Sequence, residues 1–263
     1  MDPAIVVALI TSGLALIGTA YTAYAQRRAE AQRLLLQARL DEQRITLESR
    51  LEQERAEKTK AELAHELMGR YRNPLLGAAY DLQGRLWNIV RQGFLEVYYQ
   101  RGTPDEQNYA RNHVLYVLAE YLGWVEILRR DVQFLDLGAE EENRRLMEQL
   151  ELVRQQLATD GMDPMFRVFR GQQRAIGELM MRSAEAGDER RECMGYANFV
   201  KRMGDDETFA RWFARLRQDV DLLAREPERH DERLRAVQHA LIDLIALLDP
   251  LAERTPMAKR QKL

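Results

Sequence analysis

Hydrophobic and charged residues follow three successive patterns along the chain. Residues 4–25 carry no charge, residues 26–68 place opposite charges at helical spacing, and residues 75–248 repeat apolar residues every three or four positions. The last pattern is typical of amphipathic helices around a shared core. Strand-like alternation is confined to residues 165–169. The sequence therefore predicts an all-α protein made of an N-terminal transmembrane helix, a long charged helical stalk and a multi-helix bundle.

The uncharged segment is long enough to cross a bilayer. It would span roughly 33 Å as a helix, against a hydrocarbon core of about 30 Å. A cleaved signal peptide is an alternative, because Ala23-Tyr24-Ala25 resembles a cleavage site, and a soluble buried helix is another. The segment lacks the basic start of a signal peptide and continues directly into a charged helix. We therefore expect residues 1–25 to be a retained anchor in the lipid bilayer.

The basic residues around this segment predict its orientation. None precedes it, whereas four arginines follow closely: Arg27, Arg28, Arg33 and Arg39. Because positive flanks stay in the cytoplasm, the N-terminus should lie outside and most of the chain inside. The single cysteine, Cys193, agrees with a reducing compartment. Basic residues are mostly arginine, as in GC-rich bacteria, so we expect a single-pass protein of the bacterial inner membrane.

A line of small residues at i+4 spacing runs along the same segment: Thr11, Ala15, Thr19 and Ala23. Such a line lets two membrane helices approach closely and would support self-association. Small residues are also common in membrane helices in general. Both interpretations stay open at this point.

Residues 26–70 read as a charged helical stalk. Pairs such as Arg44 and Glu48 support a single helix. Leu40, Leu47 and Leu51 allow only a weak coiled coil, because Arg44, Glu54 and Lys58 occupy other core positions of that frame. Asn73 before Pro74 should interrupt the helix, which places a boundary there. We expect a helical bundle at residues 71–250 and a basic, flexible tail at residues 251–263.

Within the bundle, apolar spacing predicts a series of helices. The helix after Pro74 carries an aliphatic stripe and a second, aromatic stripe, which together predict a central position: Leu75, Ala79, Leu82, Leu86, Ile89 and Val97, then Tyr80, Trp87, Phe94 and Tyr98. Thr103 and Glu106 form a capping box that starts a helix to about residue 135. Further helices are expected at about residues 140–157, 172–184, 206–223 and 231–248.

No catalytic or metal-binding motif emerges from the sequence. Glu62 and His65 have the spacing of half a di-iron motif but lie on the charged stalk, and His113, His230 and His239 have no ligand partner at helical spacing. There is no glycine-rich phosphate loop, and Cys193 reads as a packed residue. A net charge of −3 argues against a general nucleic-acid coat. We expect no enzyme activity, cofactor, metal or nucleic acid.

One basic cluster suggests ligand binding. Arg167, Arg170 and Arg174 lie close together in a turn and helix, and Arg190 and Arg191 follow in the next loop. Guanidinium groups bind phosphate or carboxylate through paired hydrogen bonds, so a nucleotide or lipid headgroup could bind there. The alternative is a solvated face whose arginines pair with neighbouring acids.

The order of span, stalk and the segments "YRNPLLGAAYDLQGRLWNI", "YLGWVEILRRDVQFL" and "FRGQQRAIGELM" resembles uncharacterised bacterial membrane-anchored helical proteins. This resemblance implies no activity. Our leading expectation is a membrane-anchored cytoplasmic interaction or scaffold module that binds a protein partner or itself. The alternatives are a sensor or effector that binds an anionic ligand at the arginines, in stress or defence signalling, and a membrane-tethered enzyme.

Overall fold

The computed structural model describes residues 3–133, 141–182, 191–226 and 231–263. Inside these helices it leaves some side chains undescribed, namely those of residues 3–21, 23–25, 29, 31, 60, 61, 63–68, 142 and 143. The small-residue line of Thr11, Ala15, Thr19 and Ala23 lies outside the described side chains, and Arg190 lies outside the described residues.

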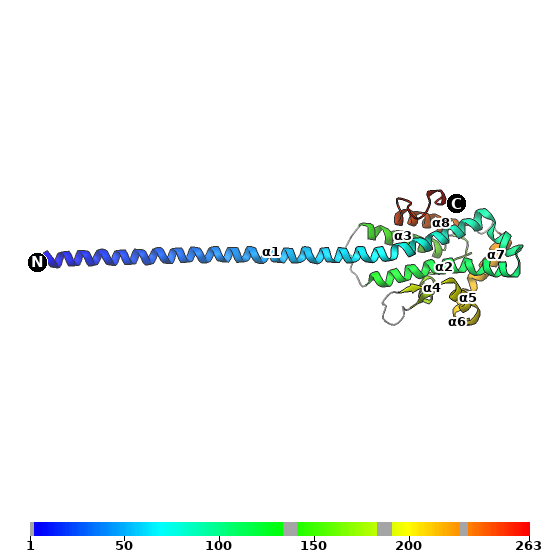
Figure 1. Cartoon of the computed structure of the whole chain (residues 1–263), viewed down its shortest axis with the longest axis horizontal. Helices are drawn as coiled ribbons and strands as arrows, with labels where there is room; N and C mark the ends of the chain where they lie inside the picture. The colour runs from blue at the N-terminus through cyan, green and yellow to red at the C-terminus, as the bar shows by residue number, and fades with distance from the viewer. Residues whose placement is uncertain (1–2, 134–140, 183–190, 227–230) are drawn as a thin grey trace. The chain divides into compact units, whose positions relative to one another are not determined.

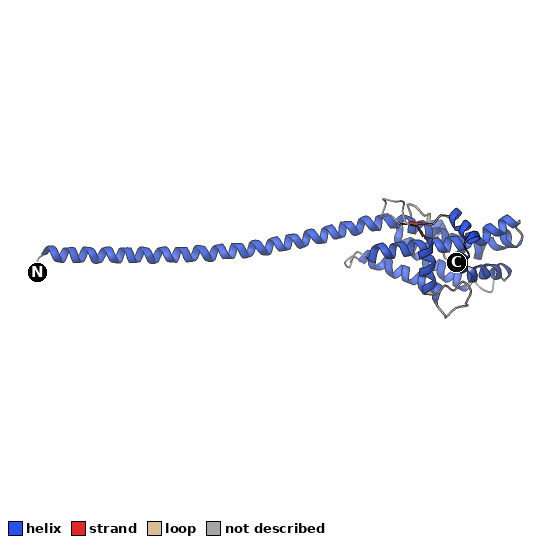
Figure 2. Ribbon diagram, turned by 90° about the horizontal axis from the view of Figure 1, so that it is seen from below, coloured by secondary structure: helices blue, strands red, loops and turns tan. Residues whose placement is uncertain are grey.

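The chain divides into two compact units, Met1–Lys60 and Ala61–Leu263. The described residues are almost entirely helical, which confirms the predicted helical bundle (Figure 1, Figure 2). The elements are α1 (Pro3–Gln92), η1 (Glu96–Gln100), α2 (Pro104–Gln133), α3 (Glu141–Ala158), α4 (Arg170–Met180), β1 (Met181–Arg182), β2 (Glu192–Cys193), α5 (Tyr196–Asp205), α6 (Glu207–Arg211), α7 (Ala214–Arg225), α8 (Glu232–Leu248) and η3 (Met257–Lys259). The two short strands pair antiparallel, with Met181 opposite Cys193.

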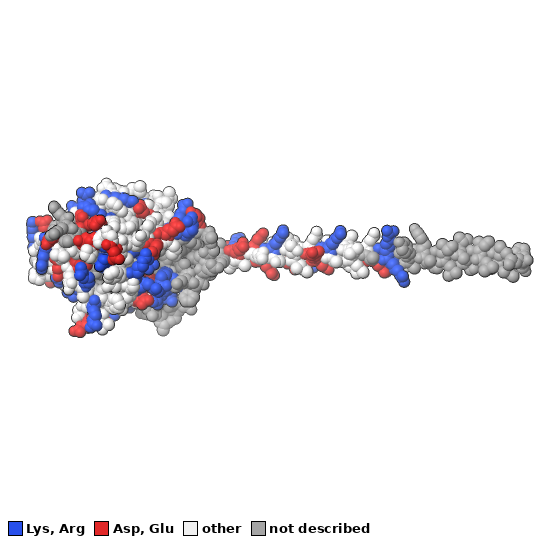
Figure 3. Space-filling model, turned by 180° about the vertical axis from the view of Figure 1, so that it is seen from behind, with Lys and Arg blue, Asp and Glu red and all other residues white. Residues whose placement is uncertain are grey.

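The prediction of a single-pass inner-membrane protein is corrected by the structure. No helix within the described part of the chain has the length and apolar character that a membrane span requires. In the first unit, the described side chains of α1 include charged groups at nearly every turn from Arg27 to Lys58, and these leave no long apolar run between those two residues (Figure 3). The assignment of the chain to the inner membrane, with its N-terminus outside, is therefore withdrawn.

The predicted helix break at Asn73-Pro74 is also wrong, because α1 continues through Pro74 to Gln92. A proline inside a helix removes one backbone donor and crowds the carbonyl one turn earlier. Packing compensates for that cost. Leu75 and Leu76 are buried, and Arg72 Nε donates to the carbonyl of Leu248 at 2.5 Å. Tertiary contacts thus keep a helix where the local sequence alone disfavours one.

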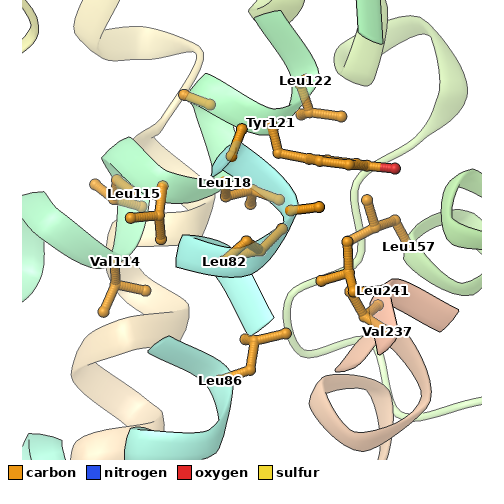
Figure 4. Packing of buried hydrophobic residues seen from close by; sticks show 14 of the residues in the cluster. Leu82, Leu86, Val114, Leu115, Leu118, Tyr121, Leu122, Leu157, Val237 and Leu241 are labelled. Atoms are coloured by element: carbon orange, nitrogen blue, oxygen red, sulfur yellow. The ribbon is translucent and has the colours of Figure 1, made fainter. Parts of the chain in front are cut away.

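The core of the second unit forms where α1, α2, α3 and α8 meet. Figure 4 shows apolar side chains from all four helices packed against one another: Leu82, Leu86, Val114, Leu115, Leu118, Tyr121, Leu122, Leu157, Val237 and Leu241. The expected spacing of three or four residues therefore does mark the buried faces of α2 and α8. The capping box is present too, since Thr103 N donates to Glu106 Oε2 at 2.8 Å and Glu106 N donates to Thr103 Oγ1 at 3.4 Å.

A buried arginine fixes the connection between α3 and α4. Arg233 of α8 is 1% exposed, and its guanidinium donates to the carbonyls of Gln156, Thr159, Asp163 and Met165 at 2.6 to 3.1 Å. Four acceptors satisfy most of the donors of one guanidinium. This arginine therefore acts as a scaffold for a loop that has little regular structure of its own.

Two regions differ from the expected helices. The predicted helix 206–223 is divided into α6 and α7, with a turn at Trp212, and α5 was not predicted. Residues 251–263, expected to be a flexible tail, fold back onto the bundle. Gln238 Nε2 donates to the carbonyl of Gln261 at 2.8 Å, and Lys262 Nζ lies 2.7 Å from Asp243 Oδ1.

Candidate functional site

A polar cleft of about 710 Å³ lies in the second unit between α1, α2 and the C-terminal segment. Side chains three or four positions apart form each helical wall. Most of them are aromatic, amide or charged: Tyr80, Asp81, Gln83, Gly84, Arg85, Trp87, Asn88 and Gln92 on α1, His113, Tyr116, Val117 and Glu120 on α2, and Ala258, Lys259 and Gln261 in the tail. A concave site with several convergent polar groups is the usual form of a ligand-binding site.

Two carboxylates, Asp81 of α1 and Glu120 of α2, line this cleft. Burial raises the pKa of Glu120, the hydrogen bond from Tyr116 Oη at 3.0 Å lowers it, and the charge of Asp81 raises it again, so that the net shift is upward. Asp81 is exposed at the cleft surface, but partial burial still raises its pKa against the opposing pull of Arg85. Ionisation of each carboxyl group therefore costs more free energy in the folded protein than in water.

Neither carboxylate has an ion-pair partner among the described side chains. The fully buried carboxylates of the bundle, Glu126, Asp219 and Asp249, are each bonded to arginine. Glu126 lies 2.6 Å from Arg129, and Asp219 lies 3.0 Å from Arg215. Glu120 is half-buried and Asp81 is exposed, so the two carboxylates bring negative charge to the cleft that no ion pair within the described residues neutralises.

A histidine and an arginine, His113 and Arg85, also line the cleft. Burial lowers the pKa of His113 to about 4, with a further contribution from Arg85, so the imidazole is neutral at physiological pH. The ring of His113 lies 5.1 Å from that of Tyr109 and 5.6 Å from that of Tyr196. Arg85 stacks over Phe94 at 3.9 Å, which holds its guanidinium against the wall. His113 Nδ1 and Arg85 Nε are buried and without a hydrogen-bond partner in the described structure.

The C-terminal segment forms the third wall of the cleft. Gln238 Nε2 donates to Gln83 Oε1 at 3.3 Å and to the carbonyl of Gln261, while Gln83 Nε2 donates to the carbonyl of Lys259 at 3.5 Å. Gln83 and Gln238 are both buried. These two amides therefore fix the tail beside α1 and set the width of the cleft.

The arginines predicted to bind an anion are not gathered into one open site. Arg167 Nη1 lies 2.7 Å from Asp160, Arg170 is bonded to Glu151, and Arg191 is bonded to Asp131. Arg174 is exposed and lines a small cavity of about 80 Å³ that also contains Glu126, Glu151, Arg129 and Arg154. The three paired arginines contact three different acidic residues, which matches the solvated-face alternative more closely than a phosphate site.

The remaining reactive residues are held in structural positions. Cys193 is half-buried, and burial followed by the charge of Glu120 raises the pKa of its thiol to about 12. Its Sγ packs against Gly123, where an added Cβ would lie only 2.7 Å away. Within the described residues, no group of three or more His, Cys, Asp and Glu side chains is arranged to hold a metal ion.

The sequence analysis named some residues of the cleft but did not predict that they form a site. The aromatic stripe of Tyr80, Trp87, Phe94 and Tyr98 was expected to mark a central helix. Phe94 is buried, but Tyr80 and Trp87 line the polar cleft and Tyr98 is 42% exposed. The signal that was missed is the matching face of α2, where polar and aromatic residues recur at the same spacing. Neither stripe defines a cleft until the two helices are paired.

The site must be interpreted from its own chemistry. No protein-family model, curated protein or solved structure matches the chain.

Proposed function

We propose that the unit Ala61–Leu263 is a helical interaction module whose protein partner places a cationic side chain in the cleft between α1 and α2. The observation that supports this function is the pair Asp81 and Glu120, which line one cleft and form no ion pair with a described side chain, although Arg85 and Lys259 line the same cleft. A cation between them would remove their mutual repulsion. Each charge-assisted hydrogen bond formed in this way contributes roughly 1.5–3 kcal/mol.

The walls of the cleft favour a guanidinium over an ammonium group. Tyr80, Trp87 and Tyr116 provide aromatic rings beside the two carboxylates. A planar guanidinium can stack on such rings while it donates two parallel hydrogen bonds to a carboxylate. An ammonium group forms a point contact and is more strongly hydrated. We therefore expect arginine to bind more tightly than lysine.

The amides of the cleft favour a peptide over an isolated amine. Asn88, Gln92 and Gln261 each present both a donor and an acceptor at the cleft. A peptide backbone has the complementary carbonyl and N–H groups, whereas a simple amine has only donors. Arg85 and Lys259 also line the cleft and would repel a ligand that carried positive charge alone.

The test uses the full chain and a small arginine probe. Trp87 lines the cleft, so its fluorescence should change when acetyl-Gly-Arg-Gly-amide binds. Combining Asp81→Asn with Glu120→Gln should weaken this binding at least about tenfold, as expected for the loss of one or two charge-assisted hydrogen bonds. Glu148→Gln, an exposed change on α3, is the matched control and should bind like the parent protein.

Two results would contradict the proposal. The first is no saturable binding of the arginine probe, or equal binding of the acidic probe acetyl-Gly-Glu-Gly-amide. The second is unchanged affinity in the double variant while its melting temperature equals that of the parent. A Trp87→Phe variant that gives the same fluorescence change would show that the signal arises at Trp124 or Trp212 instead.

A further inference from the structure

The cleft continues beyond Gln92 into a second hollow. This hollow has a volume of about 660 Å³ and shares Arg85, Asn88 and Gln92 with the first. Because three residues line both spaces, they form one groove along α1 and α2. Asp81 and Glu120 lie at one end of this groove, and Asp105 lies at the other.

One face of α2 gives the groove its length. Residues at spacings of three or four line it from end to end: Asp105, Tyr109, His113, Tyr116 and Glu120. With a rise of 1.5 Å per residue, Asp105 and Glu120 are separated by about 22 Å along the helix. An extended peptide rises about 3.3 Å per residue and covers this distance in about seven residues.

The far end of the groove combines apolar surface with one carboxylate. Val97 and Tyr98 are 49% and 42% exposed, and Tyr109 is 41% exposed. Exposed aromatic rings of this kind are common at protein–protein contacts. Glu106 is already bonded to Thr103 in the capping box, whereas Asp105 has no partner among the described side chains.

We infer that the groove binds an extended peptide segment with two basic residues about seven positions apart. One basic side chain binds at Asp81 and Glu120, the other binds at Asp105, and an apolar side chain between them packs on Tyr98 and Tyr109. This inference rests on the proposed function and adds the form of the partner. Arg85 lines the middle of the groove. It would repel the further positive charges of a linear polyamine, whereas the backbone of a peptide is neutral at this point.

The test compares acetylated, amidated peptides of one length by calorimetric titration of the full chain. The peptides carry one arginine, two arginines seven positions apart, or two arginines three positions apart, on a serine and alanine background. The seven-position peptide should bind about two- to fivefold more tightly than either of the others, as expected for a second ion pair at the exposed carboxylate of Asp105. Asp105→Asn should reduce its affinity to that of the single-arginine peptide, and Glu148→Gln should not.

The outcomes separate this inference from the proposed function. If all three peptides bind equally, Asp105→Asn has no effect, and the combined Asp81→Asn and Glu120→Gln change still abolishes binding, the extended segment is wrong and the cation site stands. If no peptide binds, both fail. If spermine binds as tightly as the seven-position peptide and depends on the same carboxylates, the peptide assignment is overturned in favour of a polyamine. Melting temperatures of all variants check that each one is folded.

Discussion

Arg260 donates a hydrogen bond to the carboxylate of Asp249 at 2.7 Å, and both side chains are more than nine-tenths buried. The same carboxylate accepts hydrogen bonds from the backbone N–H groups of Glu253, Arg254 and Thr255. Burial would raise the pKa of Asp249, but the hydrogen bonds from Thr255, Arg254 and Glu253 outweigh it and lower the pKa to about 2. This cluster determines where the chain turns after α8 and begins the wall of the cleft.

Replacing Arg260 should detach that wall. Arg260→Met leaves a buried carboxylate without its cation, which is strongly destabilising when one partner of a buried pair is removed. We expect trypsin to cleave after Lys259 and Arg254 much faster than in the parent chain, as measured by mass spectrometry. Lys262→Met removes only an exposed pair with Asp243 and should change stability by less than about 0.5 kcal/mol. Equal cleavage rates in Arg260→Met and the parent would contradict the assigned role.

Stability and binding should change in opposite directions at Glu120. The pKa of Glu120 is raised in the folded state, so its contribution is most favourable when it is protonated and is lost as pH rises through the folded pKa. Glu120→Gln removes that cost. We expect the melting temperature of Glu120→Gln to exceed that of the parent at pH 7, and the difference to shrink at pH 4. A melting temperature that falls at pH 7 would show that the ionised carboxylate stabilises the bundle.

Burial of Cys193 should make its thiol slow to react. A pKa of about 12 leaves about a thousandfold less thiolate at neutral pH than an ordinary cysteine has. We expect iodoacetamide to modify the folded chain at least about a hundredfold more slowly than the same chain in urea, as followed by intact mass. Comparable rates would mean that the thiol is activated and that the structural interpretation of Cys193 is wrong.

The helices were predictable because their buried faces repeat in the sequence. Leu118 and Leu128 of α2, and Leu241 of α8, lie on periodic stripes that bury as expected. Periodicity shows which residues share a face, but it does not show what that face contacts. Trp87 was therefore grouped with Phe94 on one aromatic stripe of a central helix, because no local pattern indicates that α2 offers a matching polar face. Phe94 is buried, but Trp87 lines the polar cleft.

Other features depend on contacts between residues distant in the sequence. Pro74 stays helical because residues near it pack on α8, more than 170 positions later, through Arg72 and Leu248. The partner of Arg170 is Glu151 on the preceding helix. The local sequence does not show this pairing, so it predicts more unpaired positive charge than the folded protein has. Similarly, Gln238 fixes the tail through Gln261, which the basic composition of that segment did not reveal.

The contact between α2 and α4 depends on the absence of a side chain at Gly177. A Cβ at this position would lie 2.7 Å from the carbonyl oxygen of Leu122 and 2.7 Å from Cβ of Glu126. Both neighbours belong to the backbone region of α2 and cannot move aside as a flexible side chain would. Gly171 lies in the same helix but has no neighbour within 4 Å of its added Cβ.

This difference predicts opposite effects for one substitution at two positions of α4. Gly177→Ala must push α4 away from α2 and should lower the free energy of unfolding by about 1–3 kcal/mol. Gly171→Ala meets no clash and reduces the freedom of the unfolded chain, so it should raise the same free energy by up to about 1 kcal/mol. Urea denaturation measures both, provided that the slope m is unchanged. If Gly177→Ala is as stable as Gly171→Ala, α2 and α4 are not in close backbone contact at Leu122 and Glu126.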